Sequence, residues 1–275
     1  MKSKNLIKQL LIYALLIIGT VLSLGPFYWM IVGATNPSGD ILSFPPKLIP
    51  GDHLMENLTN LMSSTNIFQA LLNSSLIAVI FVVLSLLICS TAGYVFAKFR
   101  FRGRNLIFAA FLISMMIPYQ ATIIPLFQVF SGIDLINTYW AVLLPQLCYP
   151  FAIFLMRQNM QAIPDSLIEA SRVDGAGEFY IFFKIILPTM KPALAAVAIF
   201  LFTFQWNNFM WPLIVLTTEN NYTLPVALST LAGFNSIDYG QLMLGTIISI
   251  IPVAIVFFLL QKHFVSGILG GAVKE

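Results

Sequence analysis

Six long apolar segments, separated by polar connections, account for most of the chain. A transmembrane helix takes about 20 consecutive apolar residues, and each segment approaches or exceeds that length. The pattern therefore predicts an all-α membrane protein with six transmembrane helices. We expect these helices to run approximately over residues 10–32, 71–97, 106–130, 139–156, 192–216 and 242–261.

Prolines predict irregularity in two of the six segments. Pro118 and Pro125 lie inside the third segment, where a lost backbone donor and a ring clash should kink the helix. The fourth segment contains Pro145 and Pro150 and is expected to be irregular too. Pro192, by contrast, falls at the start of the fifth segment, where its missing N–H costs least.

The first segment has the position of a cleavable signal peptide. Its apolar stretch is longer than the roughly 7–15 residues of a signal sequence, however, and no A-x-A-like cleavage site follows it. Gly25 and Pro26 interrupt the stretch, which then continues through Phe27, Tyr28 and Trp29. We interpret it as a retained helix with an aromatic belt near its outer end.

Lysine and arginine are distributed unequally between the two sides of the predicted membrane domain. Thirteen of the fourteen lie in the two tails and in the connections after the second and fourth segments, and only Lys47 lies on the other side. Cytoplasmic loops carry the excess of such residues. We therefore expect both termini in the cytoplasm, with an N-terminal tail over residues 1–9, a membrane domain over 10–261 and a C-terminal tail over 262–275.

Composition supports the membrane assignment and argues against several functions. Hydrophobic residues make up 59% of the chain and charged residues only 9%, whereas a soluble domain carries about 25% charged residues. All acidic and basic residues fall in connections, tails or segment ends. Ion-coupled transporters usually hold ionisable groups at depth, so this distribution argues against one. The chain also lacks a G-x-x-x-x-G-K-[ST] phosphate loop, so if it moves a solute uphill, the energy must enter from another polypeptide.

The reactive side chains give no sign of a chemical site. Cys89 and Cys148 lie in apolar runs, where packing explains them, and they suggest no disulfide framework. His53 and His263 are far apart without ligand spacing, so we expect no metal site. No nucleophile–base pair falls within the segments, which argues against an intramembrane enzyme. We also expect no cofactor on this chain and no nucleic-acid partner.

The connection between the fourth and fifth segments, residues 157–191, is the most informative polar stretch. Pro164 ends the preceding segment, and Asp165 or Ser166 is free to cap a new helix. Good helix formers continue to Asp174, with the charged residues off the apolar face. The pattern predicts a short amphipathic helix, which the positive-inside distribution places in the cytoplasm.

A sharp turn and a second helix complete this connection. Gly175 can take the left-handed conformation that ends a helix, and residues 178–186 are expected to be helical until Pro188 stops them. The alanine and glycine residues around the turn have little bulk, so the backbone of another protein can approach closely. The alternative is an amphipathic connector that lies on the bilayer without a partner.

The same connection carries a family resemblance. The motif Glu-Ala-Ser over residues 169–171 is followed after three residues by Gly175, and nine further residues lead to Ile-Ile-Leu-Pro over 185–188. This spacing resembles the signature of permeases of ATP-binding-cassette importers, with Ser171 in place of the usual second alanine. The Asp-Gly-Ala triplet over 174–176 resembles the form found in sugar-importer permeases.

The resemblance extends over nearly the whole chain and looks most like the smaller, maltose-permease-type subunit of carbohydrate importers. The further stretches that carry it are Asn73-Ser74, Ala92-Gly93-Tyr94 with the basic connection after it, Ile117-Pro118, Ile124-Pro125-Leu126, Asn137-Thr138-Tyr139-Trp140, Trp206-Asn207-Asn208 and the tail from Gly267 to Lys274.

The resemblance implies a type I ATP-binding-cassette importer permease fold with a cytoplasmic coupling helix, located in the bacterial cytoplasmic membrane. It implies a heterodimer with a second permease chain, two cytoplasmic ATPase subunits that bind ATP and Mg²⁺, and an external solute-binding protein. The implied function is one half of a sugar pathway, with an oligosaccharide favoured, that works by alternating access. The implied ATPase-coupling residues are Glu169, Ala170, Ser171, Asp174, Gly175 and Ala176.

A sugar path needs polar groups that match hydroxyls, together with aromatic faces, near the middle of the membrane. The fifth segment offers both, and the third segment offers a further glutamine. The alternative is that these polar groups form hydrogen bonds between helices. The candidate residues of the path are Gln120, Gln205, Trp206, Asn207, Asn208 and Trp211.

The connection between the fifth and sixth segments is predicted to lie on the outer side. It carries the aromatic residues Tyr222, Phe234 and Tyr239. The resemblance implies that this connection reaches toward the solute-binding protein, with these residues in contact. The alternative is a packed surface loop.

Two other functions are alternatives. Permeases for amino acids, peptides or phosphate share the shorter core of the motif, whereas the Asp-Gly-Ala context over 174–176 favours sugars. An ion-coupled secondary transporter is disfavoured, because the predicted membrane interior lacks ionisable residues.

Overall fold

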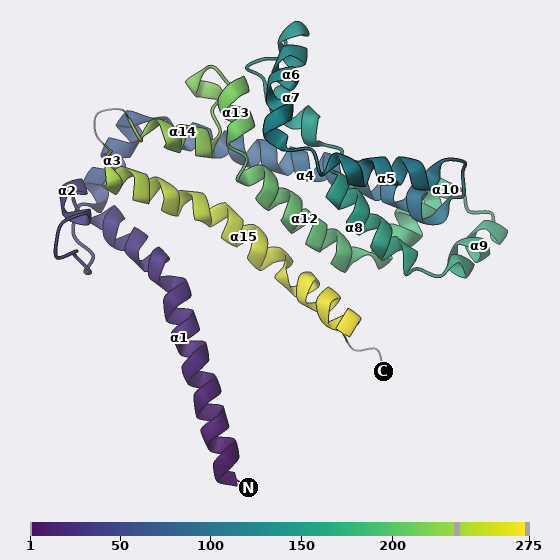
Figure 1. The fold of residues 1–275 in the computed structure, drawn as a ribbon, viewed down its shortest axis with the longest axis horizontal. Coiled ribbons are helices and arrows are strands. Elements are labelled where there is room, and N and C mark those ends of the chain that lie inside the picture. The colour runs from purple at the N-terminus through teal and green to yellow at the C-terminus, as the bar shows by residue number, and fades with distance from the viewer. Residues whose placement is uncertain (1, 234–236, 273–275) are drawn as a thin grey trace. The chain divides into compact units, whose positions relative to one another are not determined.

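The computed structural model of the protein describes residues 2–233 and 237–272. The described residues form helices, turns and irregular chain, and no β-strand occurs among them (Figure 1). They divide into two compact units, one built from residues up to 67 with 227–250, and the other from residues 68–226 with the chain from 251 onward. The prediction of an all-α protein is confirmed.

Three helices contain uninterrupted stretches that are long and apolar enough to cross a membrane: α1 (Lys2–Thr35), α4 (Ile67–Lys98) and α15 (Tyr239–Ala272). Pro26 lies inside α1 without ending it, as the prediction of a single first helix requires. Within the described chain, the predicted total of six spans is reached only if each of three bent helix pairs forms one span.

The first unit is organised around the C-terminal end of α1. This end packs against α2 (Ser38–Ile41) and α3 (Leu54–Ser64). The buried amide of Asn57 stabilises the junction, because it donates to the carbonyl oxygens of Ala34 and Asn36 at 2.9 and 3.1 Å.

The core of the second unit lies between α4, α5 (Arg104–Ser114), α8 (Pro150–Gln161) and α12 (Lys191–Trp206). α4 approaches α8 so closely that a Cβ added to Gly93 would lie 2.7 Å from the Cβ of Met156. The large side chains that are fully buried in this core include Phe81, Ile153, Met156, Leu201 and Trp211.

The third predicted segment is broken far more sharply than a proline kink. α5 ends at Ser114, α6 (Tyr119–Gly132) begins after Pro118, and the two helix axes differ by 101°. Pro118 occupies the N-cap position of α6, so it starts a new helix where a bend within one was predicted. Pro125 lies inside α6 and does not interrupt it.

The fourth predicted segment is irregular, as expected. It consists of α7 (Tyr139–Leu143), a 3₁₀ turn η1 (Leu144–Gln146) and α8, with a bend of 47° before α8. Pro150 lies in the first turn of α8, where its missing donor is not needed.

The fifth predicted segment ends earlier than residue 216. α12 stops at Trp206, and a separate helix, α13 (Met210–Val215), follows. The side-chain amide of Asn207 donates back to the carbonyl oxygen of Thr203 at 2.9 Å. The backbone N–H of Asn207 donates to the same carbonyl oxygen at 3.1 Å, so the last helical hydrogen bond of α12 ends at this residue. The chain then passes through η3 (Glu219–Asn221) and α14 (Leu224–Thr230) before α15.

Candidate functional site

The connection over residues 157–191 begins with a short helix, α9 (Asp165–Val173), where the sequence predicted one. Pro164 occupies the N-cap position and no side chain caps the helix, so the prediction that Asp165 or Ser166 caps it is wrong. Asp165 falls inside the first turn, and its carboxylate instead accepts a hydrogen bond from Lys98 Nζ at 2.6 Å. This bond and the lysine charge lower the pKa of the Asp165 carboxyl.

The end of α9 has the geometry that its glycine predicts. Gly175 has a φ of +83°, in the left-handed region, and its N–H donates to the carbonyl oxygen of Arg172 at 3.0 Å. The N–H of Ala176 donates to the carbonyl oxygen of Ser171 at 3.0 Å, which completes a Schellman cap. A Cβ added to Gly175 would meet no atom of this chain within 4 Å. This glycine is therefore required for its conformation and not for space within the chain.

The exposed side of α9 contains most of the predicted coupling residues. Glu169, Ala170, Asp174 and Gly175 are exposed, and Ala176 is half-buried. Ser171 is buried, and its hydroxyl donates to the carbonyl oxygen of Leu167 at 2.7 Å. The serine that replaces the usual alanine therefore leaves no unpaired hydroxyl in the interior.

A hollow and two exposed apolar side chains mark the tip of this connection. The hollow has a volume of about 470 Å³ and is formed mainly by the turn over residues 174–177. Val173 and Phe179, on either side of the turn, are 87% and 83% exposed. These two side chains add apolar surface next to the exposed polar residues of α9.

The second helical stretch of the connection runs further than predicted. α10 (Glu178–Tyr180) continues into a π-helix, η2 (Ile181–Ile186), and then into α11 (Leu187–Thr189). Pro188 does not stop the helix, because it lies in the first turn of α11, where its N–H is not needed. The break falls at Met190, and α12 leaves at an angle of 83°.

Two polar links fix this connection to the C-terminal end of α4. The first is the pair of Lys98 and Asp165. The second is Glu178, whose carboxylate accepts from the Tyr94 hydroxyl at 3.2 Å and from Arg172 Nε at 2.6 Å. The hydrogen bond with Glu178 raises the pKa of the Arg172 guanidinium. Sequence reasoning did not identify Tyr94, Lys98 or Glu178 as site residues, although Tyr94 lies in one of the stretches that carry the resemblance.

A cavity of about 980 Å³ lies within the second unit. Of the predicted path residues, only Asn207 and Asn208 line it, and the Asn208 amide donates to Gln146 Oε1 at 3.1 Å. Tyr119 also lines the cavity, and its hydroxyl has no hydrogen-bond partner among the described residues. Tyr119, Gln146 and Tyr149, a further aromatic residue at the wall, were not predicted from the sequence.

The other predicted path residues do not line this cavity. Gln120 is exposed, whereas Gln205 and Trp206 are buried in α12. The ring of Trp206 stacks on Phe202 with centroids 5.5 Å apart. Trp211 is completely buried, and its indole N–H donates to the carbonyl oxygen of Ala141 at 2.8 Å. In this structure these two tryptophans pack the interior.

The three aromatic residues predicted to contact a binding protein have different settings. Tyr222 is half-buried, and its carbonyl oxygen accepts a hydrogen bond from the Asn73 amide at 3.0 Å. Tyr239 is half-buried at the start of α15, and its N–H donates to Ser38 Oγ at 2.8 Å. Phe234 lies outside the described residues.

Asparagines anchor the segment that follows α13. Asn137 has a φ of +64°, and its Oδ1 accepts from the backbone N–H groups of Thr217 and Thr218 at 3.0 and 3.1 Å. Asn73 donates to the carbonyl oxygen of Asn220 at 2.8 Å. Hydrogen bonds therefore anchor residues 217–220, in agreement with the alternative of a packed surface loop.

Among the described residues, no group of three or more His, Cys, Asp or Glu side chains could hold a metal ion.

Comparison with known proteins assigns the family. The model of the family "Binding-protein-dependent transport system inner membrane component" matches residues 89–270. The lactose transport system permease protein LacG of Rhizobium radiobacter is 38% identical over 94% of both chains. The arabinooligosaccharides transport system permease protein AraQ of Halalkalibacterium halodurans is 38% identical over 90% of both. A more distant relative, 31% identical over 94% of both chains, is the sn-glycerol-3-phosphate transport system permease protein UgpE of Yersinia pestis.

A solved structure supports the same assignment. A chain of a bacterial ATP-binding-cassette transporter involved in import of the acidic polysaccharide alginate matches with a TM-score of 0.82 and 25% identity, over 95% of this chain and 98% of that one. This likeness confirms the predicted importer-permease fold. The chain therefore belongs to the family of inner membrane components of binding-protein-dependent transport systems, and it is a multi-pass transport permease subunit and not an enzyme.

Proposed function

We propose that this chain is one half of the translocation pathway of an ATP-driven sugar importer, with an oligosaccharide as the favoured substrate. The names of the relatives at 38% identity, one for lactose and one for arabinooligosaccharides, support this assignment, because they match nearly the whole length of the chain. The Asp-Gly-Ala triplet over 174–176 agrees with it.

A second candidate is a permease for a small phosphorylated polyol. The relative named for sn-glycerol-3-phosphate transport favours it, at 31% identity. Both candidates use the same architecture and differ only in the groups that meet the solute.

In this proposal the partners are a second permease chain, two cytoplasmic ATPase subunits and an external solute-binding protein. The N-terminal tail over residues 1–9, the connection over 157–191 and the C-terminal tail over 262–275 face the cytoplasm, in line with the distribution of lysine and arginine. ATP and Mg²⁺ bind to the ATPase partners, and this chain holds neither.

The exposed side of α9 and the turn after it form the proposed ATPase contact. Glu169, Ala170, Asp174 and Gly175 supply polar and small groups there, next to the exposed Val173. The links of Lys98 to Asp165 and of Tyr94 to Glu178 join this contact to α4. A movement of α9 by the ATPase would therefore pull on a membrane-spanning helix, which is what alternating access requires.

The sugar path proposed for this chain is the cavity lined by Asn207, Asn208 and Gln146. Amide groups both donate hydrogen bonds to sugar hydroxyls and accept hydrogen bonds from them. Tyr149 and Phe204, with ring centroids 4.6 Å apart, supply aromatic surface for the faces of the sugar rings. Tyr222, Phe234 and Tyr239 are the proposed contacts to the solute-binding protein.

The coupling role is tested by two variants of Gly175 in the reconstituted importer. Gly175→Ala adds little bulk but places a strained residue at a left-handed φ, whereas Gly175→Asn adds more bulk at a conformation that asparagine tolerates. Because a Cβ at this position meets no atom of this chain within 4 Å, we expect the added bulk to matter where a partner is seated. We expect the asparagine variant to lose more sugar-stimulated ATP hydrolysis than the alanine variant, with the permease pair still assembled.

The reverse order, with alanine worse than asparagine, would mean that only the helix cap matters. Wild-type hydrolysis and transport in both variants would mean that the connection has no ATPase contact at this point. Either result refutes the coupling proposal. Stimulation of the wild-type complex by glycerol 3-phosphate, and by no sugar, would favour the second candidate substrate.

A further inference from the structure

The turn that joins α4 to α5 carries positive charge without an internal counter-charge. Lys98, Arg100, Arg102 and Arg104 fall within seven positions, and no acidic residue lies among them. Lys98 pairs with Asp165. The three arginines form no ion pair with the residues that the structure describes, although Arg100 lies within electrostatic reach of Asp165.

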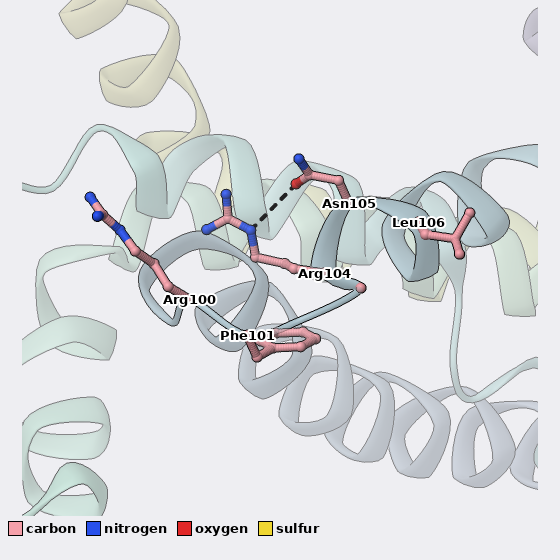
Figure 2. A pocket seen from close by; sticks show the side chains of 6 residues that line it. Arg100, Phe101, Arg104, Asn105 and Leu106 are labelled. Atoms are coloured by element: carbon pink, nitrogen blue, oxygen red, sulfur yellow. Dashed lines mark hydrogen bonds between the residues drawn. The ribbon is translucent and has the colours of Figure 1, made fainter.

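The backbone brings two of these arginines to one hollow. Gly103 has a φ of +86°, and this left-handed residue reverses the chain immediately before α5. Arg100 and Arg104, on either side of the reversal, line a hollow of about 300 Å³ together with Phe101, Asn105 and Leu106 (Figure 2). Arg102, between them in the sequence, does not line it.

The two arginines of the hollow are held differently. Arg104 Nη1 donates to the carbonyl oxygen of Phe99 at 3.2 Å, and its Nε lies 3.4 Å from Asn105 Oδ1, as the dashed line in Figure 2 marks. These contacts fix one guanidinium at the wall while leaving some of its N–H groups free. Within this hollow as the structure describes it, both side-chain hydrogen bonds come from Arg104 and none from Arg100. The Arg100 guanidinium is therefore available to a ligand.

Exposed apolar side chains lie next to this charge. Leu106 is 77% exposed, and Phe101 and Ile107 are exposed as well. The turn joins a continuous membrane-spanning helix to the first half of a bent helix pair, so it lies where the chain re-enters the membrane. Arginines with apolar neighbours at that level match a molecule with an anionic group and an apolar tail. A free phosphate ion has no apolar part that could contact these side chains.

We propose that this turn binds an anionic phospholipid, with Arg100 and Arg104 on the headgroup phosphate and Leu106 against an acyl chain. A guanidinium offers planar pairs of N–H donors that match phosphate oxygens. Basic pockets at the ends of membrane helices are established binding places for acidic headgroups. No residue that lines this hollow also lines the proposed sugar path or belongs to the proposed ATPase contact.

The test is native mass spectrometry of the complete importer complex with phosphatidylglycerol or phosphatidylcholine added to the detergent micelles. Arg100→Gln and Arg104→Gln should weaken binding of phosphatidylglycerol by about tenfold or more, because each removes charge-assisted hydrogen bonds. Arg102→Gln is the matched control, since it removes the same charge from the same turn but lies outside the hollow. General attraction between the basic turn and an anionic lipid, without a defined site, would weaken lipid binding about fivefold in each of the three variants.

Arg100→Gln is the decisive variant, because Arg104 also contacts the turn itself and its loss could disturb the fold. Equal weakening in all three variants, or wild-type binding in Arg100→Gln, would overturn the proposal. Displacement of the lipid by excess inorganic phosphate alone would identify a plain phosphate site and also overturn it. So would loss of the ATPase subunits from Arg100→Gln with lipid binding intact, because the turn would then be a protein contact. Weaker lipid binding in Leu106→Gln would support the acyl-chain contact.

Discussion

Replacement of Gly93 by alanine tests the closest approach between membrane helices in the second unit. A Cβ at this position would lie 2.7 Å from Met156 Cβ and 2.9 Å from the backbone nitrogen of Arg157, whereas ordinary contacts are 3.4–4 Å. Neither atom can rotate away, since one is backbone and the other is attached directly to it. α4 and α8 must therefore separate by roughly 1 Å in a closely packed interior, and overpacking of this kind costs about 1–3 kcal/mol.

The assay is thermal unfolding of the full chain in detergent, with Gly132→Ala as the matched control. Gly132 is the last residue of α6, and a Cβ there would meet nothing within 4 Å. By the scaling of soluble domains, we expect Gly93→Ala to melt roughly 2–10 °C below the wild type. Gly132→Ala should melt at the wild-type temperature or slightly higher, because alanine favours a helix by up to about 1 kcal/mol over glycine. If Gly93→Ala melts with the wild type, or both variants fall equally, the close approach of α4 and α8 is refuted.

Two further predictions concern the cavity and the connection. Asn208→Leu keeps the number and branching of the side-chain heavy atoms but removes the amide that bonds Gln146. We expect it to raise the sugar concentration needed for half-maximal uptake, whereas Asn159→Leu, at an exposed site on α8, should not; equal uptake curves for the two variants would contradict the proposed path. Lys98 should hold the pKa of Asp165 below its ordinary value of 3.8. The Lys98–Asp165 pair then stabilises the fold at pH values above 3.8. This stabilisation is lost as the pH falls through the lowered pKa, and it changes little around neutral pH. Carboxyl NMR titration of the chain in nanodiscs should show the low midpoint rising toward 3.8 in Lys98→Met, and an unchanged midpoint would count against the pairing.

The continuous helices were predictable because hydropathy alone defines them. α1, α4 and α15 contain uninterrupted apolar stretches, so their existence follows from length and composition. The breaks were harder to predict. Pro118 indicated where the third segment changes direction, but the 101° angle depends on the helices that pack around it. The break at Asn207 was missed because apolar residues continue beyond it to residue 216, so hydropathy gave no sign that the helix ends there.

The local parts of the candidate site were predictable, and the long-range parts were not. Gly175 was placed correctly because a left-handed helix end depends on a single residue type. The bonds from Tyr94 to Glu178 and from Lys98 to Asp165 join residues 84 and 67 positions apart, and no periodicity in the sequence reports such pairs. The hydrogen bonds of Asn73 and Asn137 were likewise not predictable from the sequence pattern. Resemblance marked both stretches, but only the structure shows that they anchor the segment after α13.

These long-range bonds narrow the choice of groups that can meet a sugar. Polar side chains inside a membrane protein serve either the solute or the fold, and the indole N–H of Trp211 already serves the fold through Ala141. Asn207 and Asn208 alone among the predicted path residues line the cavity. A sugar presents hydroxyls around its whole ring, and one chain of a pair can meet only the side of the ring that faces it. If the chain works as half of a pair, the second permease must therefore supply a share of the sugar contacts, and specificity should change when either chain of the pair is exchanged.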